Sequence, residues 1–135
     1  NNKERGLLGL KLETCFGWSI QVTAGDVKAN TFLNWPIQAH GAEMLRIACI
    51  LAVESGIKLC APIHDALLIE APADQIDAEV VRLKDCMFEA SEAVLGDGKV
   101  CRVDADIVRY PDRYMDEHGQ EMWNQIMGLL AQTQE

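Results

Sequence analysis

The fold prediction depends most on one stretch of the sequence: Ile57-Lys58-Leu59-Cys60-Ala61-Pro62-Ile63-His64-Asp65-Ala66-Leu67-Leu68-Ile69-Glu70-Ala71. Apolar side chains alternate through residues 57–63, which is typical of a strand, and residues 66–71 form a second apolar run. Because only His64 and Asp65 separate the two runs, they predict a tight antiparallel hairpin with these residues at its tip. Pro62 has no backbone donor, which places it at the end of the hairpin or on an edge.

Upstream of this hairpin, the sequence predicts a long helix and another hairpin. Residues 31–55 are expected to be helical, with Pro36 near the start, where a missing N–H costs least, and Gly56 as a C-cap. Residues 8–22 alternate around a turn at Phe16-Gly17 and predict the hairpin. The apolar residues of the helix occupy most of its sides, which is typical of a central, buried helix: Ile37, Met44, Leu45, Ala48, Ile50 and Leu51.

Downstream, the pattern predicts two more helices and one strand. Residues 74–95 carry apolar side chains at steps of four and three, as a one-sided amphipathic helix does, with Asp74 expected to cap the start and Gly96 the end. Residues 100–108 alternate like a strand, and residues 120–131 predict a last amphipathic helix. The order of hairpins, helices and strand predicts a single α+β domain with an antiparallel sheet.

Composition limits the classes of function. The 135 residues are 49% apolar, enough for one packed domain or a piece of a longer one. Membrane-spanning and signal-peptide segments are not found, so a cytoplasmic protein is the default expectation. The five cysteines form no Cys-x-x-Cys pair, which favours reduced thiols over disulfides or a zinc site. A net charge of -9 by itself favours a small-molecule enzyme or an interaction domain, because nucleic-acid binders usually carry a basic patch.

The His64-Asp65 pair is the chief candidate for chemistry. A tight turn would hold both side chains in one place, and a carboxylate held in this way can ligate a divalent cation, typically Mg²⁺ in phosphate chemistry. A two-metal site for an in-line displacement needs a second carboxylate as well. An ordinary turn is the alternative, because the Asp side chain readily bonds nearby backbone amides.

Further candidates each have a structural alternative. Glu70 either supports the tip or faces solvent at the end of its strand. Asp104 and Asp106 share one face of the predicted strand, either as a carboxylate pair or as a solvated face together with Arg102. Arg109, Arg113 and Tyr114 either contact phosphate or form structural ion pairs and contacts with nearby carboxylates. Trp35 and Trp123 are expected to be anchors of a core or an interface.

Three segments resemble family-A DNA polymerases of the bacterial DNA polymerase I type. Residues 60–72 resemble motif C, in which an apolar strand runs into His-Asp and a second strand runs out to a Glu. Asn34-Trp35-Pro36-Ile37-Gln38 is similar to the Asn-x-Pro-x-Gln of that family. Leu12-Glu13-Thr14-Cys15-Phe16-Gly17 resembles the Glu-Thr-x-x-Gly hairpin of the fingers. The resemblance covers residues 10–114, and the segments follow in the family's order.

The resemblance implies a domain plan and an activity. Residues 1–135 would be one C-terminal fragment of a polymerase domain, with the end of the fingers and its hairpin in residues 1–30. Residues 31–135 would be the palm, with a palm-type antiparallel sheet, the motif C hairpin and the C-terminal helices. The implied activity is that of a DNA-directed DNA polymerase, which performs template-directed nucleotidyl transfer in replication or repair through two Mg²⁺ ions.

The same resemblance implies roles for four residues. Asp65 would ligate the catalytic Mg²⁺, and His64 would lie against the primer terminus. Asn34 and Gln38 would face the primer–template duplex, because side-chain amides can bond the minor-groove acceptors present at every base pair. Capping at the start of the helix is the alternative for Asn34 and Gln38. Primer–template DNA and deoxynucleoside triphosphates are the implied partners of the complete enzyme.

The chain departs from the family pattern in several places. Ala66 stands where the family usually has Glu, and Asn30 where it often has Arg. The family's Gly-Thr-Ala-Ala-Asp-like stretch is Ala39-His40-Gly41-Ala42-Glu43, in which His40 either approaches DNA or is an ordinary surface histidine. Ala66 removes a carboxylate near the implied metal ions, and Asn30 removes a charged contact to the template side.

The polymerase elements that the chain lacks define what it is expected to do. Neither the motif A Asp nor the Lys and Arg of motif B is present, so the chain alone is expected to be inactive, and the basic surfaces would lie in the missing parts. The alternative is a non-catalytic polymerase remnant that acts as an interaction module, which Ala66 and the acidic charge favour. An isolated palm piece would also expose surface that the missing half covers, and we expect it to self-associate or to be only marginally stable. An unrelated small-molecule enzyme has no nucleophile or phosphate-loop signature in its support.

Overall fold

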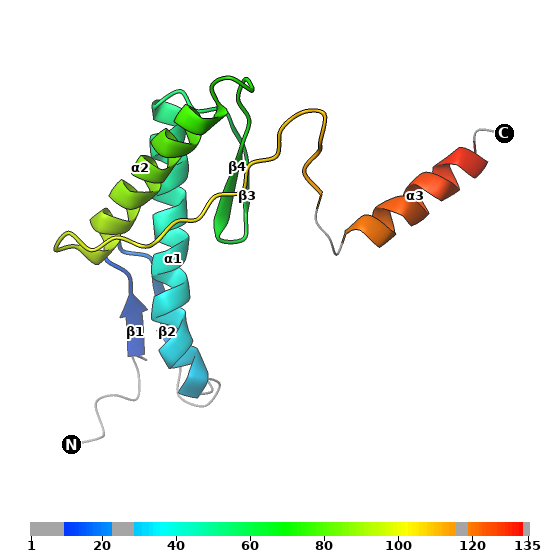
Figure 1. The fold of residues 1–135 in the computed structure, drawn as a ribbon. Helices are drawn as coiled ribbons and strands as arrows, with labels where there is room; N and C mark the ends of the chain where they lie inside the picture. The colour runs from blue at the N-terminus through cyan, green and yellow to red at the C-terminus, as the bar shows by residue number, and fades with distance from the viewer. Residues whose placement is uncertain (1–9, 23–28, 116–118, 134–135) are drawn as a thin grey trace, which may run out of the picture. The chain divides into compact units, whose positions relative to one another are not determined.

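The computed structural model describes residues 10–22, 29–115 and 119–133. The chain divides into two compact units, Asn1–Ala105 and Asp106–Glu135. The architecture of the described residues is α+β, with two small antiparallel sheets of two strands each and three helices (Figure 1). In chain order the elements are β1 (Leu10–Glu13), β2 (Ser19–Val22), α1 (Ala29–Glu54), β3 (Leu59–Ile63), β4 (Ala66–Ile69), α2 (Ile76–Leu95) and α3 (Gln120–Gln132).

Both hairpins pair neighbouring strands in antiparallel register. In the first, Leu12 lies opposite Ile20, and the chain reverses through residues 14–18. In the second, Ile63 lies opposite Ala66, which leaves only residues 64 and 65 in the turn. An irregularity between Leu59 and Ala61 shifts the register of β3 and interrupts the alternation predicted for residues 57–63.

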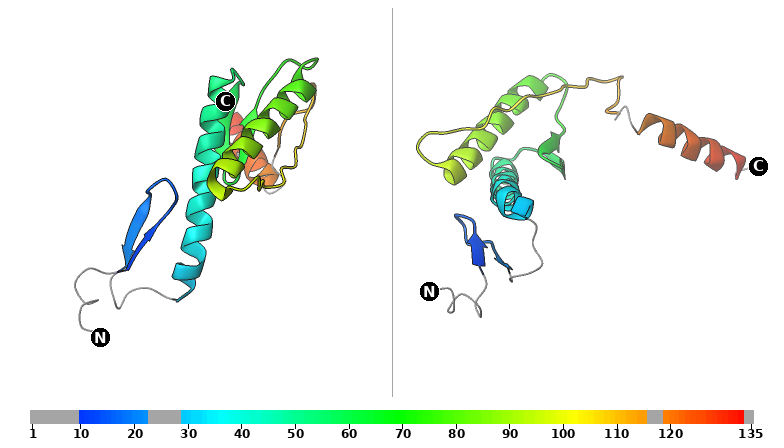
Figure 2. Two further views of the ribbon diagram at one scale, coloured as in Figure 1. Left: turned by 90° about the vertical axis from the view of Figure 1, so that its left-hand side faces the viewer. Right: turned by 90° about the horizontal axis from the view of Figure 1, so that it is seen from below.

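The long helix α1 is covered by neighbouring elements on some of its sides and exposed on others. Where the structure describes the side chains of α1, the buried ones are small or polar: Ala39, Glu43, Ala48 and Ala52. Hairpin β1–β2 lies along the N-terminal half of α1, and α2 along the C-terminal half, on opposite sides (Figure 2). Leu33, Ile37, Ile50 and Val53 are at least half exposed, so the prediction of a helix buried all round is wrong. Apolar residues on every side cannot indicate which sides a partner will cover.

Helix α2 completes the core of the first unit. Its periodicity was predicted correctly, and Leu83 and Cys86 pack with Ala52 and Ile57. The partly buried Leu51, Leu67, Ile69 and Met87 surround this cluster. Gly96 ends α2 as predicted, with a φ of 69° and its N–H bonded to the carbonyl of Glu92 at 2.7 Å.

The start of α2 and its link to α1 differ from a simple capping pattern. Gln75 occupies the N-cap without a side-chain hydrogen bond, so the prediction that Asp74 caps the helix is wrong. Arg82 donates to Glu79 at 2.5 Å and to the carbonyl of Ser55, just beyond the end of α1. The last turn of α1 has no basic residue, so Arg82 supplies the positive charge that a helix C-terminus favours.

The strand predicted for residues 100–108 is not observed. Residues 99–105 run alongside α2 without a strand partner in the described part of the chain (Figure 1). They are held instead by the N–H of Cys101, which donates to the buried hydroxyl of Ser91 at 3.1 Å. Alternation predicts an extended backbone, but a strand also requires a neighbouring backbone edge.

In the second unit, α3 matches the predicted helix of residues 120–131, but none of its residues is buried. Trp123 is therefore not a core residue of the described structure, with 52% of its surface exposed. None of the described helices has the length and apolar content needed to cross a bilayer.

Candidate functional site

The tip of hairpin β3–β4 presents His64 and Asp65 to solvent. The two side chains are 89% and 91% exposed, and His64 Nδ1 lies 3.5 Å from Asp65 Oδ1. The strands on either side fix the backbone of both residues within a turn of two residues. The imidazole and the carboxylate are thereby held next to each other and open to a ligand.

His64 adopts a backbone conformation that L-residues seldom take. Its φ is +54°, in the left-handed region, where glycine is the usual residue. Unfavourable backbone geometry persists where the surrounding structure enforces it, and such positions concentrate at functional sites. A glycine at this position would make the turn without strain but would carry no imidazole.

The donor chemistry of the tip fits part of a Mg²⁺ site. Asp65 offers hard carboxylate oxygens, and Mg²⁺ commonly takes one or two carboxylates while keeping several waters. Among the residues that the structure describes, no group of three His, Cys, Asp or Glu side chains converges on one point. Ala66, the next residue, adds no ligand.

Glu70 lies at the other end of the hairpin, so its predicted support of the tip is wrong. It follows β4, so five residue steps separate it from Asp65, or about 16 Å at about 3.3 Å per residue. Glu70 forms an ion pair with Lys58. The pKa of Lys58 is raised, mainly by the hydrogen bond to Glu70 and secondly by the charge of its carboxylate. The alternative of a solvent-facing strand end describes Glu70 correctly.

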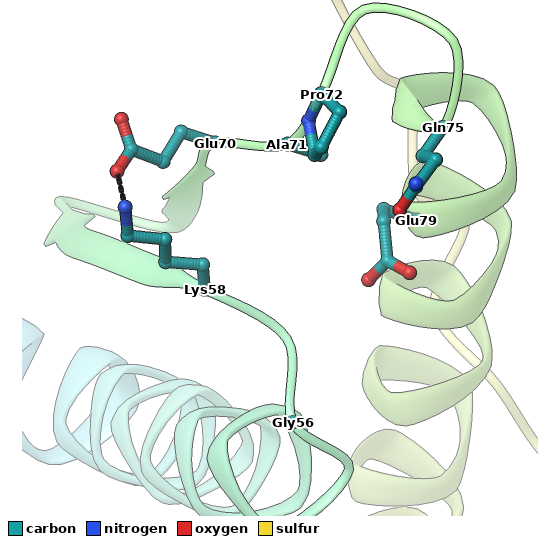
Figure 3. Close-up of a pocket in the computed structure, with 7 residues that line it drawn as sticks. All are labelled: Gly56, Lys58, Glu70, Ala71, Pro72, Gln75 and Glu79. Atoms are coloured by element: carbon teal, nitrogen blue, oxygen red, sulfur yellow. Dashed lines mark ion pairs between the residues drawn. The ribbon is translucent and has the colours of Figure 1, made fainter.

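The Lys58–Glu70 pair borders a hollow of about 400 Å³ at the base of the hairpin (Figure 3). The hollow lies between the start of β3, the end of β4 and the first turns of α2, away from His64 and Asp65. Its lining consists of Gly56, Lys58, Glu70, Ala71, Pro72, Gln75 and Glu79.

Asn34 and Gln38 are exposed and lie one helical turn apart in the N-terminal part of α1. Asn34 is inside the helix, which begins at Ala29, so the capping alternative is wrong for this residue. Strand β3 runs back alongside α1, so the tip of its hairpin points toward the half of α1 that carries both amides (Figure 1).

Several other candidates have ordinary structural roles. His40 is half-buried and donates from Nδ1 to the carbonyl of Pro36 at 2.6 Å. Asp104 accepts two hydrogen bonds from Arg102, at 3.2 and 2.8 Å. Because no strand forms there, the prediction that Asp104 and Asp106 share a strand face is wrong. Arg109, Arg113 and Tyr114 are exposed residues of the second unit.

A buried polar cluster around Glu43 was not predicted from the sequence. This carboxylate is only 1% exposed, and Oε1 accepts a hydrogen bond of 2.6 Å from the Thr14 hydroxyl. Oε2 lies 3.6 Å from the Cys15 thiol, and Arg46 lies 3.6 Å from Oε1. Desolvation, the hydrogen bond to Glu43 and the charge of Glu43, in this order, raise the pKa of Cys15.

One signal in the sequence could have revealed this cluster. Glu43 is an acidic residue among Ala39, Ala42 and Ala48, on a helix whose apolar character predicted burial. An acidic residue with little exposure needs partners. The Thr-Cys turn of the first hairpin provides them, but only the tertiary structure brings this turn to α1.

Comparison of the chain with protein-family models, with curated proteins and with solved structures found no match.

Proposed function

We propose that this chain is the C-terminal part of the palm of a family-A DNA polymerase and contributes one of the two metal-binding carboxylates. The observation that carries the proposal is the tip of β3–β4, where His64 and Asp65 alone form the turn and are almost fully exposed. An apolar hairpin with this dipeptide at its tip is the pattern of motif C. The exposed amides of Asn34 and Gln38 on the preceding helix agree with the second motif.

In this proposal Asp65 is a ligand of the catalytic Mg²⁺ ions, and a carboxylate outside this chain is the other. When bound, these ions would supply charge neutralisation on the phosphate oxygens during in-line displacement. The exposed imidazole of His64, next to Asp65, lies against the primer terminus. Asn34 and Gln38 donate to minor-groove acceptors of the duplex, which tests base-pair geometry without reading sequence.

The acidic charge is consistent with a partial site. With a net charge of -9, the chain repels a phosphate backbone unless cations or basic surfaces intervene. A Mg²⁺ ion held by Asp65 would offset the negative charge at the tip. The remaining positive surface has to come from other parts of the polymerase.

The decisive experiment uses the complete protein. The coding sequence upstream of residue 1 should encode an Asp-bearing strand motif and a Lys-bearing fingers helix in frame. The complete protein should extend a primed template with Mg²⁺ and deoxynucleoside triphosphates, and the isolated chain should not. Asp65→Asn should lower kcat at least about 1,000-fold, or about 4 kcal/mol in activation free energy, because a metal ligand is lost.

Glu70→Gln is the matched control, since it removes an exposed carboxylate from the same hairpin, at the end away from the tip. Its activity should stay within about twofold of the unmodified enzyme. An Asp65→Asn enzyme that keeps more than a tenth of its activity would contradict the proposal. Extension by the isolated chain would contradict its partial character.

The non-catalytic remnant is a second proposal, favoured by Ala66 in place of the usual Glu. It predicts that the coding sequence upstream of residue 1 encodes neither an Asp-bearing strand motif nor a Lys-bearing fingers helix, and that neither the complete protein nor its Ala66→Glu variant extends a primer. An exposed apolar face on α3 is compatible with an interaction module.

A further inference from the structure

Glu43 is a buried carboxylate on α1 whose neighbours come from a distant hairpin. A charged group is costly to bury unless hydrogen bonds and opposite charge replace the lost water. Thr14, 29 residues earlier, supplies the shortest of these bonds, and Cys15 approaches the second oxygen. Arg46, one turn along α1, provides the positive charge.

The same turn is organised around the Thr14 hydroxyl. Thr14 Oγ1 donates to Glu43 and accepts a 3.0 Å hydrogen bond from the N–H of Trp18. The Trp18 ring meets the Trp35 ring edge to face, with centroids 6.0 Å apart and planes at 61°. Glu43 and Trp35 are therefore two points at which α1 holds the hairpin.

These two points lie on one stripe of α1. Trp35, Ala39 and Glu43 follow each other at steps of four residues, and Ala39 between them is 2% exposed. Asn34 and Gln38 each precede a stripe residue by one position, so they lie about 100° around the helix from it. The stripe is occupied by the hairpin, and the neighbouring face keeps both amides exposed.

We propose that Glu43 is a positioning residue, whose carboxylate holds hairpin β1–β2 on α1 and thereby fixes the orientation of Asn34 and Gln38. A buried polar contact of this kind specifies one docking register, because any other register leaves the carboxylate without partners. The hold on the hairpin stands on contacts within the chain. Its consequence for duplex binding rests on the proposed polymerase function.

The first experiment tests the hold in the 135-residue chain, in a Trp123→Phe background so that circular dichroism reports only the Trp18–Trp35 pair. Glu43→Leu removes the carboxylate at similar volume and should abolish the coupled Trp signal while the far-ultraviolet helix signal remains. Thr14→Val should do the same, whereas Thr14→Ser retains the hydroxyl and should restore the signal. Thr133→Val, at an exposed Thr directly after α3, is the matched control and should leave the coupled Trp signal unchanged.

A second variant separates loss of the hold from loss of folding. Glu43→Gln keeps an acceptor for Thr14 and should retain most of the coupled signal. If Glu43→Leu and Thr14→Val both keep the full Trp18–Trp35 signal, Glu43 does not hold the hairpin. If Glu43→Leu unfolds the chain but Thr14→Val leaves a folded chain with an intact Trp signal, the proposal is likewise overturned.

The second experiment measures duplex affinity in the complete polymerase. Gln38→Ala should weaken primer–template binding about tenfold, and Glu43→Leu about fivefold with less change in the KM for the nucleotide. If Gln38→Ala weakens primer–template binding and Glu43→Leu does not, the positioning role of Glu43 is overturned. No effect of Gln38→Ala would refute the duplex role assigned by the proposed function, while the Trp measurement would still decide whether Glu43 holds the hairpin.

Discussion

The two hairpins share an architecture and differ in what their turns do. Each consists of two short antiparallel strands. The turn of β1–β2 faces inward: Thr14 is 5% exposed and bonded to α1. The turn of β3–β4 faces outward, with His64 and Asp65 in solvent. The polar Thr14 of the first turn is therefore bonded within the protein, whereas the polar residues of the second turn are free to contact a ligand.

The difference follows from how each hairpin is attached. Leu67 and Ile69 of β4 pack against the core around Leu83 and Cys86, so the second hairpin is fixed by apolar contacts along its strands. The first hairpin is attached at its turn, through Glu43, and at Trp18. A hairpin anchored along its strands leaves its tip free for a ligand, whereas one anchored by its turn does not.

Leu83→Ala should have the largest effect on stability and should separate the two attachments. Removing this buried side chain should lower the free energy of unfolding by about 2–4 kcal/mol, because the core loses contacts and gains a cavity. Urea denaturation measures this change, and hydrogen exchange should show greater loss of protection in β3–β4 than in β1–β2. Val81→Ala, on the exposed side of α2, should cost about 0.5 kcal/mol or less. Equal loss of protection in both hairpins would contradict the separate attachment.

Each hairpin turn contains a residue with positive φ, and the two should respond to substitution in opposite directions. Gly17 has a φ of 86° in the first turn, and His64 a φ of 54° in the second. Gly17→Ala should lower the free energy of unfolding by about 1 kcal/mol, because a Cβ disfavours the left-handed region. His64→Gly should leave it unchanged or raise it by up to about 1 kcal/mol, because relief of strain offsets the greater freedom of the unfolded chain. Thermal unfolding of both variants tests this, and a His64→Gly variant destabilised by more than about 1 kcal/mol would show that His64 supports the fold.

The rate of Cys15 alkylation should report whether the β1–β2 turn contacts Glu43. Its raised pKa means that the thiolate, the reactive form, is scarce near neutral pH. Glu43→Gln removes the carboxylate charge, so the rate profile of Cys15 with iodoacetamide should move to lower pH, although desolvation, the largest cause, remains. Peptide mass spectrometry can follow Cys15, with the exposed Cys60 on the other hairpin as internal control. An unchanged Cys15 profile would argue against contact with Glu43 in solution.

The same shift has a consequence for stability. The folded-state pKa of Cys15 is raised above its ordinary value of 9.0, so the protonated thiol contributes to the free energy of unfolding. This contribution is fully present below about pH 9 and is lost as pH rises through the folded-state pKa. Glu43→Gln should therefore lose less stability than the unmodified chain on going to alkaline pH.

The smallest effect is expected at the base of the second hairpin. Glu70 raises the pKa of Lys58 above 10.5. The ion pair therefore stabilises the fold below this pH, and its contribution is lost as pH rises through the folded-state pKa of Lys58. Both side chains are more than half exposed, and exposed ion pairs contribute little. The unfolding midpoints of the unmodified chain and Glu70→Gln should differ slightly at pH 7 and coincide at strongly alkaline pH. A large difference at pH 7 would mean that the pair is better shielded from water than its exposure indicates.

The local features were predictable from sequence because their causes are local. The steps of four and three in α2, the glycine after it and the two-residue gap between β3 and β4 each act through neighbouring residues. The alternation of residues 100–108 was equally clear, yet no strand formed, because ladder hydrogen bonds need a second backbone that the pattern does not contain. The capping prediction for Asp74 failed because Gln75, not Asp74, occupies the N-cap of a helix that begins at Ile76.

The sequence pattern was sufficient to predict the two hairpins, the three helices and the shared turn of His64 and Asp65, because these depend on neighbouring residues. Long-range packing was needed to establish which sides of α1 are covered, that Glu70 lies away from the tip, and that Glu43 is buried against Thr14. These outcomes depend on contacts across 29 residues or on the direction in which a strand leaves the tip. A periodic pattern specifies which face of an element is apolar, but the partner that covers that face is selected by the packing of the whole chain.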